Sequence, residues 1–136
     1  MIEHNTTIKV RYCESDQMGY AHHSNYAKYY EVGRLEFLED LGISYRTMEE
    51  QGVILPVRSI NTRFLQPARF DDNLTLKTIL KELPTAKITL EYEIYNEENI
   101  KISTGETVLV FFDTAKQKPI KIPEELLSKF TKRFKI

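Results

Sequence analysis

One long segment of helical periodicity stands among segments that alternate like strands, and this contrast limits the folds open to the chain. The segment runs over about residues 25–41, where Ser24 or Asn25 can cap its start and Gly42 can end it. Gly33 predicts a close approach to another backbone, because glycine is unfavourable inside a helix. The apolar arc is wide, which predicts a helix packed on more than one side. The arc consists of Tyr26, Ala27, Tyr30, Gly33, Leu35, Phe37, Leu38 and Leu41.

The other segments alternate with a period of two, which is typical of half-buried strands. The first covers residues 6–12, before the helix, and a short helical segment at 44–51 follows the helix. Residues 108–112 are apolar on both faces, which predicts that the last strand is central and covered on both sides. Pro123 is expected to open a final helix with Leu126, Leu127, Phe130 and Phe134 on one face. The four later strands are expected at residues 59–64, 74–80, 88–94 and 102–112.

The order of one strand, one long helix and four strands points to a single fold class. One helix cannot cover both faces of a five-stranded sheet, and most of the strands have only one strongly apolar side. We therefore predict an α+β fold in which a five-stranded antiparallel sheet wraps around one long central helix. Residues 1–136 are expected to form a single domain, because this is a common domain length. An edge strand or the outer face is expected to be shared with a second copy.

Charge and composition exclude several classes of partner. The 19 Lys and Arg residues balance 20 Asp and Glu residues, and a formal net charge of −1 argues against binding to nucleic acid. No run approaches the ~18 apolar residues that a membrane span needs, which argues against membrane insertion. Residues 1–10 lack the basic and apolar regions of a signal peptide, and the single Cys13 cannot form an intrachain disulfide. The expected location is the cytoplasm.

The stretch RYCESDQMGYAHHSNYAKYY contains the polar loop that joins the first strand to the helix. The plainest interpretation is a solvated connection in which Asp16 forms an Asx turn. A metal site built from His22, His23 and Asp16 is disfavoured, because adjacent histidines point in different directions and His4 is the only other histidine. Nucleophilic catalysis by Cys13 is also disfavoured, since a free cysteine is most often an inert small hydrophobe.

A third interpretation is catalytic and combines Asp16 with the start of the helix. The first turn of a helix carries unpaired N–H groups and a partial positive charge, which can polarise a carbonyl as an oxyanion hole does. A carboxylate on a loop that turns back at Gly19 could face the same carbonyl carbon. Such a sparse site suits a thioester, because a thiol with a pKa of about 8.5 leaves with little acid help. Asp16 would then act as nucleophile or as general base.

These residues also resemble a known family. The run YCESDQMGYAHHSNYAKYYEVGRLEFLEDLG, between one strand and four later strands, is similar to the hotdog-fold acyl-CoA thioesterases. The similarity is closest to the 4-hydroxybenzoyl-CoA thioesterase-like branch that includes the Tol–Pal-associated enzymes, and PARFDDNL is a weaker second marker. The resemblance implies hydrolysis of acyl-CoA to a free acid and CoA, without a cofactor or a metal.

The resemblance also implies roles for individual residues. Asp16 matches the catalytic carboxylate, and His23 matches the position whose backbone N–H polarises the thioester carbonyl. Tyr12 matches a family tyrosine with a supporting role near the site. The residues expected to bind substrate are Gly19, Asn25, Tyr26, Arg63 and Arg69, and the two arginines are the candidates for the phosphates of coenzyme A.

The assembly and the substrate follow less directly from the resemblance. The family's usual dimer shares a continuous sheet, places the active sites at the interface and is commonly paired into a tetramer, so a homodimer or homotetramer is expected. Met18, Tyr20 and Ala21 depart from the family pattern around Gly19, so neither the acyl group nor the thiol carrier is carried over.

Two alternative functions remain open from the sequence. The first is a hotdog protein that binds acyl-CoA without hydrolysing it. The second is a hotdog dehydratase acting on hydroxyacyl thioesters, which would need an acid on the helix. Glu31 and Glu36 are the nearest equivalents of such an acid.

Overall fold

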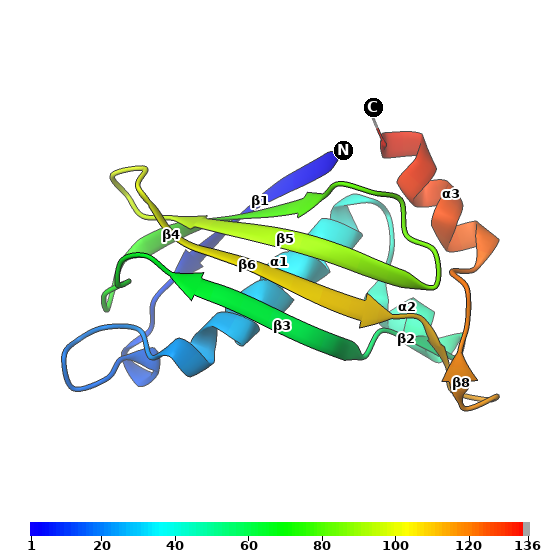
Figure 1. The fold of residues 1–136 in the computed structure, drawn as a ribbon, viewed down its shortest axis with the longest axis horizontal. Coiled ribbons are helices and arrows are strands. Elements are labelled where there is room, and N and C mark those ends of the chain that lie inside the picture. The colour runs from blue at the N-terminus through cyan, green and yellow to red at the C-terminus, as the bar shows by residue number, and fades with distance from the viewer. Residues whose placement is uncertain (135–136) are drawn as a thin grey trace.

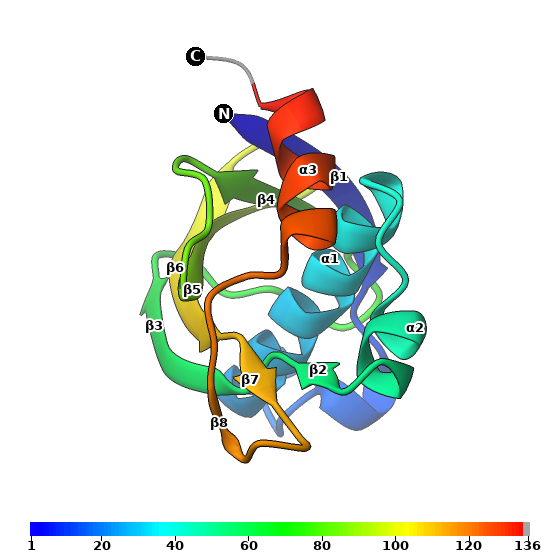
Figure 2. The ribbon, with the colours of Figure 1, turned by 90° about the vertical axis from the view of Figure 1, so that its right-hand side faces the viewer.

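The computed structural model describes residues 1–134, which form a strongly curved sheet around one helix (Figures 1 and 2). All neighbouring strands of the five-stranded sheet run antiparallel, in the order β1-β4-β5-β6-β3. This arrangement confirms the predicted fold class. The strands are β1 (Ile2–Lys9), β3 (Val57–Phe64), β4 (Asn73–Leu80), β5 (Lys87–Tyr95) and β6 (Lys101–Val110).

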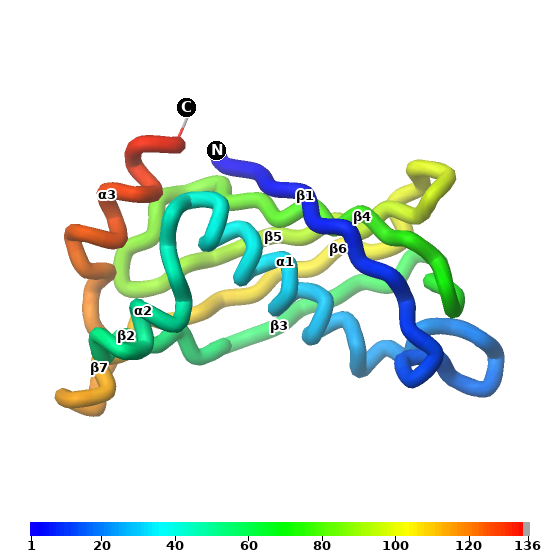
Figure 3. The backbone as a smooth tube through the Cα atoms, turned by 180° about the vertical axis from the view of Figure 1, so that it is seen from behind, coloured from blue at the N-terminus to red at the C-terminus, as the bar shows by residue number. Residues whose placement is uncertain are grey.

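The central helix α1 (Tyr26–Asp40) lies in the concave face of the sheet and packs most closely against β1 and β4 (Figure 2). The loop that precedes α1 lies at one end of the molecule, and α3 (Glu124–Arg133) lies at the other (Figures 1 and 3). None of the described helices has the length and apolar character that crossing a bilayer would require. The smaller elements are the 3₁₀ turns η1 (Tyr12–Glu14) and η2 (His23–Asn25), α2 (Tyr45–Glu50), β2 (Val53–Ile54), β7 (Phe112–Asp113) and β8 (Lys118–Pro119), and the last three strands form a second sheet.

The first strand lies earlier in the chain than its alternating pattern predicted. β1 ends at Lys9, and Tyr12 belongs to η1 instead of the strand. The physical reason is the partner strand: Lys9 lies opposite Asn73, the first residue of β4, and the chain before Asn73 is a loop. Val10 still exchanges two backbone hydrogen bonds with Asp71 and Asp72 of this loop, and the chain then turns into η1, although the residue pattern continues.

The last long strand is interior to the sheet, as predicted, but its outer face is only partly covered. β6 lies between β5 and β3, and Leu109 is buried while Val108 and Val110 are half-buried. The expectation of full cover on both faces is therefore wrong for the described chain. The pattern was misleading because the chain bends after Val110, and Phe112 belongs to the small sheet.

The buried face of α1 follows the predicted arc with four exceptions. Ala27 and Leu35 are exposed, whereas Tyr29 and Arg34 are buried. Arg34 reaches a buried hydroxyl, because its Nη1 donates a hydrogen bond of 3.3 Å to Tyr92 Oη. A classification by apolarity alone misses Arg34, since its burial depends on a polar partner elsewhere in the fold.

Gly33 allows α1 to pack closely against side chains of the sheet. A Cβ at this position would collide with the side chain of Leu76 and would lie 3.0 Å from Thr78 Oγ1, both on β4. The predicted approach to another backbone is therefore wrong, although the need for a small residue is confirmed.

The ends of the helices match the predictions unevenly. Gly42, with φ +84°, ends α1 as predicted, but neither Ser24 nor Asn25 caps its start with a side chain. His22 caps η2 instead, with its Nδ1 accepting a hydrogen bond from the Ser24 backbone N–H. The predicted apolar face of α3 is confirmed, because Phe130 is buried and its three partners are half-buried; these are Leu126, Leu127 and Phe134.

Candidate active site

The loop that carries Asp16 is a compact turn closed across its base. Ser15 and Ala21 form an isolated antiparallel bridge. Inside this bridge, the Asp16 N–H donates to the Tyr20 carbonyl at 2.8 Å, and the Gly19 N–H donates to the Asp16 carbonyl at 3.0 Å. Gly19 has φ +79°, a conformation that other L residues rarely adopt. The predicted reversal of the chain at Gly19 is confirmed.

The Asp16 carboxylate uses its two oxygens differently. Oδ1 accepts hydrogen bonds from the backbone N–H groups of Met18 (2.9 Å) and Tyr20 (3.1 Å), which is the Asx turn expected of a loop aspartate. Oδ2 has no hydrogen-bond partner within residues 1–134. The turn therefore fixes the carboxylate through one oxygen and leaves the other available to a ligand.

The start of the helix leaves one backbone donor free. The N–H groups of Ser24 and Asn25 are occupied by His22, through its Nδ1 at 3.2 Å and its carbonyl at 3.0 Å. The Tyr26 N–H donates to the His23 carbonyl. The His23 N–H, in contrast, has no acceptor among the described residues. Since this donor opens a continuous helical segment, it also lies at the positive end of the α1 dipole.

Asp16 and His23 border the same pocket, which has a volume of about 320 Å³. The wall of this pocket is largely apolar and aromatic, and the rings of Tyr26 and Phe64 meet edge to face at 4.9 Å and 87°. Burial raises the pKa of the Tyr26 hydroxyl, which stays neutral at physiological pH. The other residues that line the pocket are Tyr20, Ala21, Leu65, Gln66 and Pro67.

The loop between β3 and β4 supports the Asp16 turn. The Ala21 N–H donates to the Ala68 carbonyl at 2.8 Å, and the Phe70 N–H donates to the Gly19 carbonyl at 2.9 Å. The weaker sequence marker PARFDDNL is thus the segment against which the Asp16 turn packs. Residues 64–67 form the far wall of the pocket, and sequence reasoning missed them because it treated them as the end of a strand and a turn.

Glu14 is a second residue that sequence reasoning missed. Its side chain is only 6% exposed, and it accepts hydrogen bonds from Arg11 and from the Tyr29 hydroxyl. Burial by itself raises the pKa of this carboxyl, but the bonds from Arg11 and Tyr29 outweigh it and leave the pKa below its ordinary value. The sequence signal was an arginine three residues before a loop glutamate, a spacing that a turn can bring together.

Two predicted site residues lie beside the pocket without lining it. The Asn25 side chain is buried, and its Nδ2 donates to the carbonyls of Glu14 (2.9 Å) and His22 (3.2 Å), so it ties the loop to the helix start. Tyr12 is 79% exposed, packs edge to face on Phe70, and lines a second hollow that Asp16 also borders.

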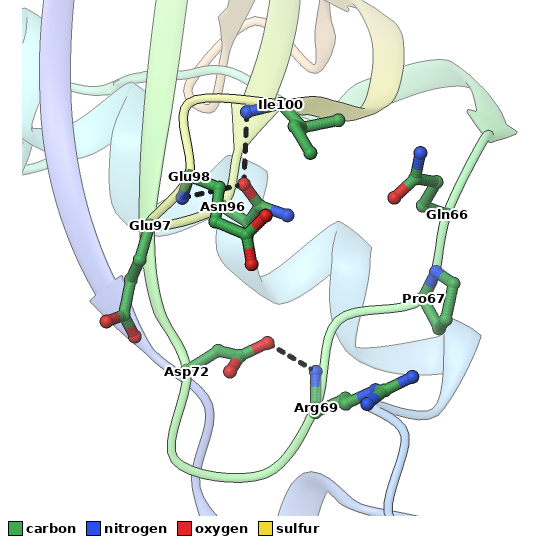
Figure 4. Close-up of a pocket in the computed structure, with 8 residues that line it drawn as sticks. All are labelled: Gln66, Pro67, Arg69, Asp72, Asn96, Glu97, Glu98 and Ile100. Atoms are coloured by element: carbon green, nitrogen blue, oxygen red, sulfur yellow. Dashed lines mark hydrogen bonds between the residues drawn. The ribbon is translucent and has the colours of Figure 1, made fainter.

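The structure does not bring the two predicted arginines to the pocket. Arg63 lines a hollow of the sheet with two carboxylates, those of Glu91 and Glu106. Arg69 lines a neighbouring pocket of about 380 Å³, where its backbone N–H donates to Asp72 Oδ2 at 2.8 Å (Figure 4). Figure 4 also shows the carboxylates of Glu97 and Glu98 on this pocket, which weaken its attraction for phosphate. The residues shared with the Asp16 pocket are Gln66 and Pro67.

The structure also shows where the residues of the metal, cysteine and dehydratase interpretations lie. His22 stacks on His23 with ring centroids 4.1 Å apart and pairs with the Ser24 hydroxyl at 2.8 Å. Within residues 1–134, no three His, Cys, Asp or Glu side chains are arranged to hold a metal ion. Cys13 is exposed and lies outside the Asp16 pocket. Glu31 and Glu36, which a dehydratase would need, are exposed and also outside it.

Comparison with known proteins places this geometry in a family. The sequence model of the thioesterase-like superfamily matches residues 10–130. YneP of Bacillus subtilis is 39% identical over 89 residues, which cover 65% of this chain and 64% of that protein. The chloroplastic acyl-acyl carrier protein thioesterase ATL3 of Arabidopsis thaliana is 33% identical over 130 residues, which cover 93% of this chain and 67% of that protein. The chain thus spans about two thirds of the length of these two relatives.

A solved structure agrees with the sequence comparison. The DHNA-CoA thioesterase of Staphylococcus aureus superposes with a TM-score of 0.91 and 33% identity, over 97% of this chain and 91% of that chain.

Proposed function

The chain belongs to the thioesterase-like superfamily, and from this premise we propose that it hydrolyses acyl-coenzyme A to a free acid and CoA. The similarity to a DHNA-CoA thioesterase and to an acyl-acyl carrier protein thioesterase supports a thioester substrate. Placement in the 4-hydroxybenzoyl-CoA thioesterase-like branch is part of the same proposal. A dehydratase has less support, because Glu31 and Glu36 lie outside the pocket.

One observation carries the proposal: Asp16 and His23 line the same pocket, and neither Asp16 Oδ2 nor the His23 N–H has a hydrogen-bond partner within residues 1–134. The His23 N–H would donate to the thioester carbonyl oxygen and stabilise the negative charge that develops there. Asp16 Oδ2 would face the carbonyl carbon from the opposite wall. The leaving thiolate needs little protonation, so this pair can be sufficient for the reaction.

Asp16 can act by two routes that leave different isotope patterns. As nucleophile, Oδ2 bonds to the carbonyl carbon, the C–S bond breaks, and water then opens the resulting anhydride. As general base, Asp16 takes a proton from water, and the water oxygen bonds directly to the carbonyl carbon. Single turnover in H₂¹⁸O tests for the nucleophilic route, because label enters the Asp16 side chain when water opens the anhydride at the Asp16 carbonyl and cannot enter it by the general-base route.

The decisive test is Asp16→Asn. The amide oxygen can still accept the two N–H bonds of the Asx turn, so the loop should keep its shape while the reacting oxygen is lost. We expect kcat to fall by about 10²–10⁴-fold, the usual contribution of such a group, with an unchanged melting temperature.

The matched control is Asp113→Asn. Asp113 Oδ1 also accepts two backbone N–H bonds, both of 2.9 Å, in the turn between β7 and β8. Full activity in Asp16→Asn, or an equal loss in Asp113→Asn, would remove Asp16 from the site. Tight binding of acyl-CoA by the wild-type chain without any turnover would favour the non-catalytic alternative.

The remaining site residues have supporting roles in the proposal. Tyr26 lines the acyl pocket, Gly19 shapes the turn, and Asn25 and Tyr12 support the loop on either side. Arg63 and Arg69 remain the candidates for the phosphates of coenzyme A; neither lines the pocket, and the Arg69 guanidinium lies 5.6 Å from the ring centroid of Tyr20, which does. Release of thiol from short, long, branched and aromatic acyl-CoA, and from acyl-carrier protein, would identify the substrate.

Assembly as a homodimer or homotetramer is also proposed, and the exposure of β3 supports it. This edge strand presents Ile60, which is 47% exposed, and Phe64, which is 52% exposed and borders the Asp16 pocket. A second copy paired along β3 would cover these side chains and complete the pocket wall. Light scattering at micromolar concentration tests this, and a stable monomer with full activity would contradict it.

The cytoplasm is the proposed location. The exposed thiol of Cys13 fits a reducing compartment, in which it would stay unpaired. Cell fractionation with antibody detection would test the location directly.

A further inference from the structure

Glu14 carries the only buried carboxylate among residues 1–134, and the proposed reaction does not use it. A buried charge is unfavourable unless several donors compensate it, so its presence needs a reason. Glu14 does not line the pocket, which excludes direct contact with substrate there. The reason must therefore lie in what Glu14 holds together.

The side chain of Glu14 joins the end of the first strand to α1. Oε1 accepts hydrogen bonds from the Arg11 backbone N–H and from the Tyr29 hydroxyl, both of 2.9 Å. Oε2 accepts from the Arg11 guanidinium, at 3.0 Å from Nε and 2.9 Å from Nη2. Tyr29 is itself buried on the first turn of α1, so its hydroxyl is a fixed donor.

The backbone of Glu14 also forms hydrogen bonds with residues at the start of the helix. Its carbonyl accepts the His22 N–H at 2.8 Å and the Asn25 Nδ2 at 2.9 Å. His22 directly precedes the residue with the free N–H, and Asp16 follows Glu14 by two residues. Asp16 and His23, which carry the two reacting groups, thus each lie within two residues of a residue that Glu14 binds or of Glu14 itself.

We propose that Glu14 is a positioning residue, which holds Asp16 Oδ2 at a fixed distance from the His23 N–H. This inference rests on the proposed function, because it assigns these two groups to the reaction. Its physical basis is that catalysis is sensitive to small displacements, and an error of about 1 Å between reacting groups can cost about 100-fold in rate. Without the bonds of the Glu14 side chain, the segment would keep the bonds of the Glu14 carbonyl to His22 and Asn25 but lose its tie to Tyr29 on α1, so the hydrogen bonds of the Asp16 turn would open more often.

Glu14→Gln and Tyr29→Phe test the proposal with little change in volume. Glu14→Gln turns one acceptor into a donor that faces the Arg11 guanidinium, and Tyr29→Phe removes a single hydroxyl. For both we expect kcat to fall by about 10–100-fold and KM to change less than about threefold, because positioning acts on the transition state.

The chain offers a matched control on the outer face of the sheet. Glu93 accepts hydrogen bonds from the Tyr95 hydroxyl at 2.8 Å and from Lys101 Nζ at 3.2 Å, so it repeats the pairing of a glutamate with a tyrosine and a cation. Glu93→Gln and Tyr95→Phe should change kcat less than about twofold, since neither residue lies on the pocket. Equal losses in both sets would show a general effect on stability and would overturn the proposal.

Two further measurements separate positioning from stability and from a wrong assignment of function. In an Asp16→Asn background, Glu14→Gln should cause no further loss of rate, because the group to be positioned is absent. Amide hydrogen exchange in Glu14→Gln should accelerate at Asp16, Met18 and Tyr20, with the sheet unchanged. If the wild-type chain hydrolyses no thioester, the proposed function fails, whereas unchanged exchange at these amides overturns the positioning role whatever the activity.

Discussion

The two ends of α1 differ in how their backbone groups are hydrogen-bonded. At the C-terminal end, the N–H groups of Gly42 and Ile43 donate to the carbonyls of Glu39 and Leu38, both at 2.9 Å. Two cations from α3 then donate to later carbonyls, Lys129 Nζ to Gly42 at 2.7 Å and Arg133 Nη1 to Asp40 at 3.1 Å. At the N-terminal end, the His23 N–H has no acceptor in the described part of the chain.

This difference shows how one helix can serve both stability and chemistry. The partial negative charge at the C-terminal end is neutralised by Lys129 and Arg133, which is a stabilising arrangement. The partial positive charge at the N-terminal end lies beside a pocket that Asp16 and His23 both line. The fold therefore completes the hydrogen bonding at one end and leaves a donor for a ligand at the other.

The strongest test of this difference between the two ends is His23→Pro, which removes the free N–H. Proline is favoured at the first position of a helix, and His22, with φ −66° and ψ 139°, has the conformation required before a proline. We expect kcat to fall by about 10²–10³-fold, the usual effect of losing an oxyanion donor, with the fold intact. Steady-state kinetics and circular dichroism measure the two effects.

His23→Ala is the matched control, because it removes the imidazole and keeps the N–H. We expect its kcat to stay within about tenfold of wild type, the difference reflecting lost contact with Phe64 rather than lost carbonyl polarisation. Equal activity in the Pro and Ala variants would show that this donor has no part in the reaction.

A smaller effect, on stability alone, is expected at the other end from Gly42→Ala. Nothing lies within 4 Å of a Cβ built at Gly42, so the change tests only the left-handed backbone, φ +84°. We expect about 1–2 kcal/mol of destabilisation in a urea titration, and an unchanged kcat in the folded enzyme. A loss of kcat similar to that of His23→Pro would show that the two ends are not independent.

Lys129→Ala should have a smaller effect still. It removes one hydrogen bond to the Gly42 carbonyl at the surface, which is worth about 0.5–1 kcal/mol. Lys132→Ala, on the same helix and without a side-chain ion pair or hydrogen bond within residues 1–134, is the control and should be neutral. If both variants unfold at the same urea concentration as wild type, the cation contributes nothing to this end.

Near neutral pH, the stability contributions of the two ends should differ least in their dependence on pH. The pKa of Glu14 is held below its ordinary value of 4.5, so its contribution is fully present above that pH and is lost as the pH falls through the lowered pKa. The stability difference between wild type and Glu14→Gln should therefore stay constant at neutral pH and shrink in acid. The effect of Lys129→Ala should not follow this acid dependence, because its hydrogen bond lies at the other end of α1. Thermal melts across pH measure both, and a difference that grows in acid would contradict the sign.

Much of the local structure was predictable, because it depends on residues close in sequence. The period of the apolar residues predicted α1 and the strands, and Gly42 and Gly19 marked two changes of chain direction that the structure contains. The predictions were wrong where a distant segment decides the outcome. β1 stops at Lys9 because its partner strand begins at Asn73, and the burial of Arg34 depends on Tyr92, 58 residues away.

The candidate site divides in the same way. By itself, the sequence determined which stretch carries a carboxylate, a turn and a helix start, because Asp16, Gly19 and His23 lie within eight residues. Only the tertiary structure decided that the His23 N–H is the free donor and that residues 64–67 close the pocket. It also buried Glu14 and left Arg63 and Arg69 out of the lining of the Asp16 pocket. The physical reason is that residue pattern specifies local conformation, whereas the partner of a hydrogen bond or the wall of a pocket depends on which distant segments the fold brings into contact.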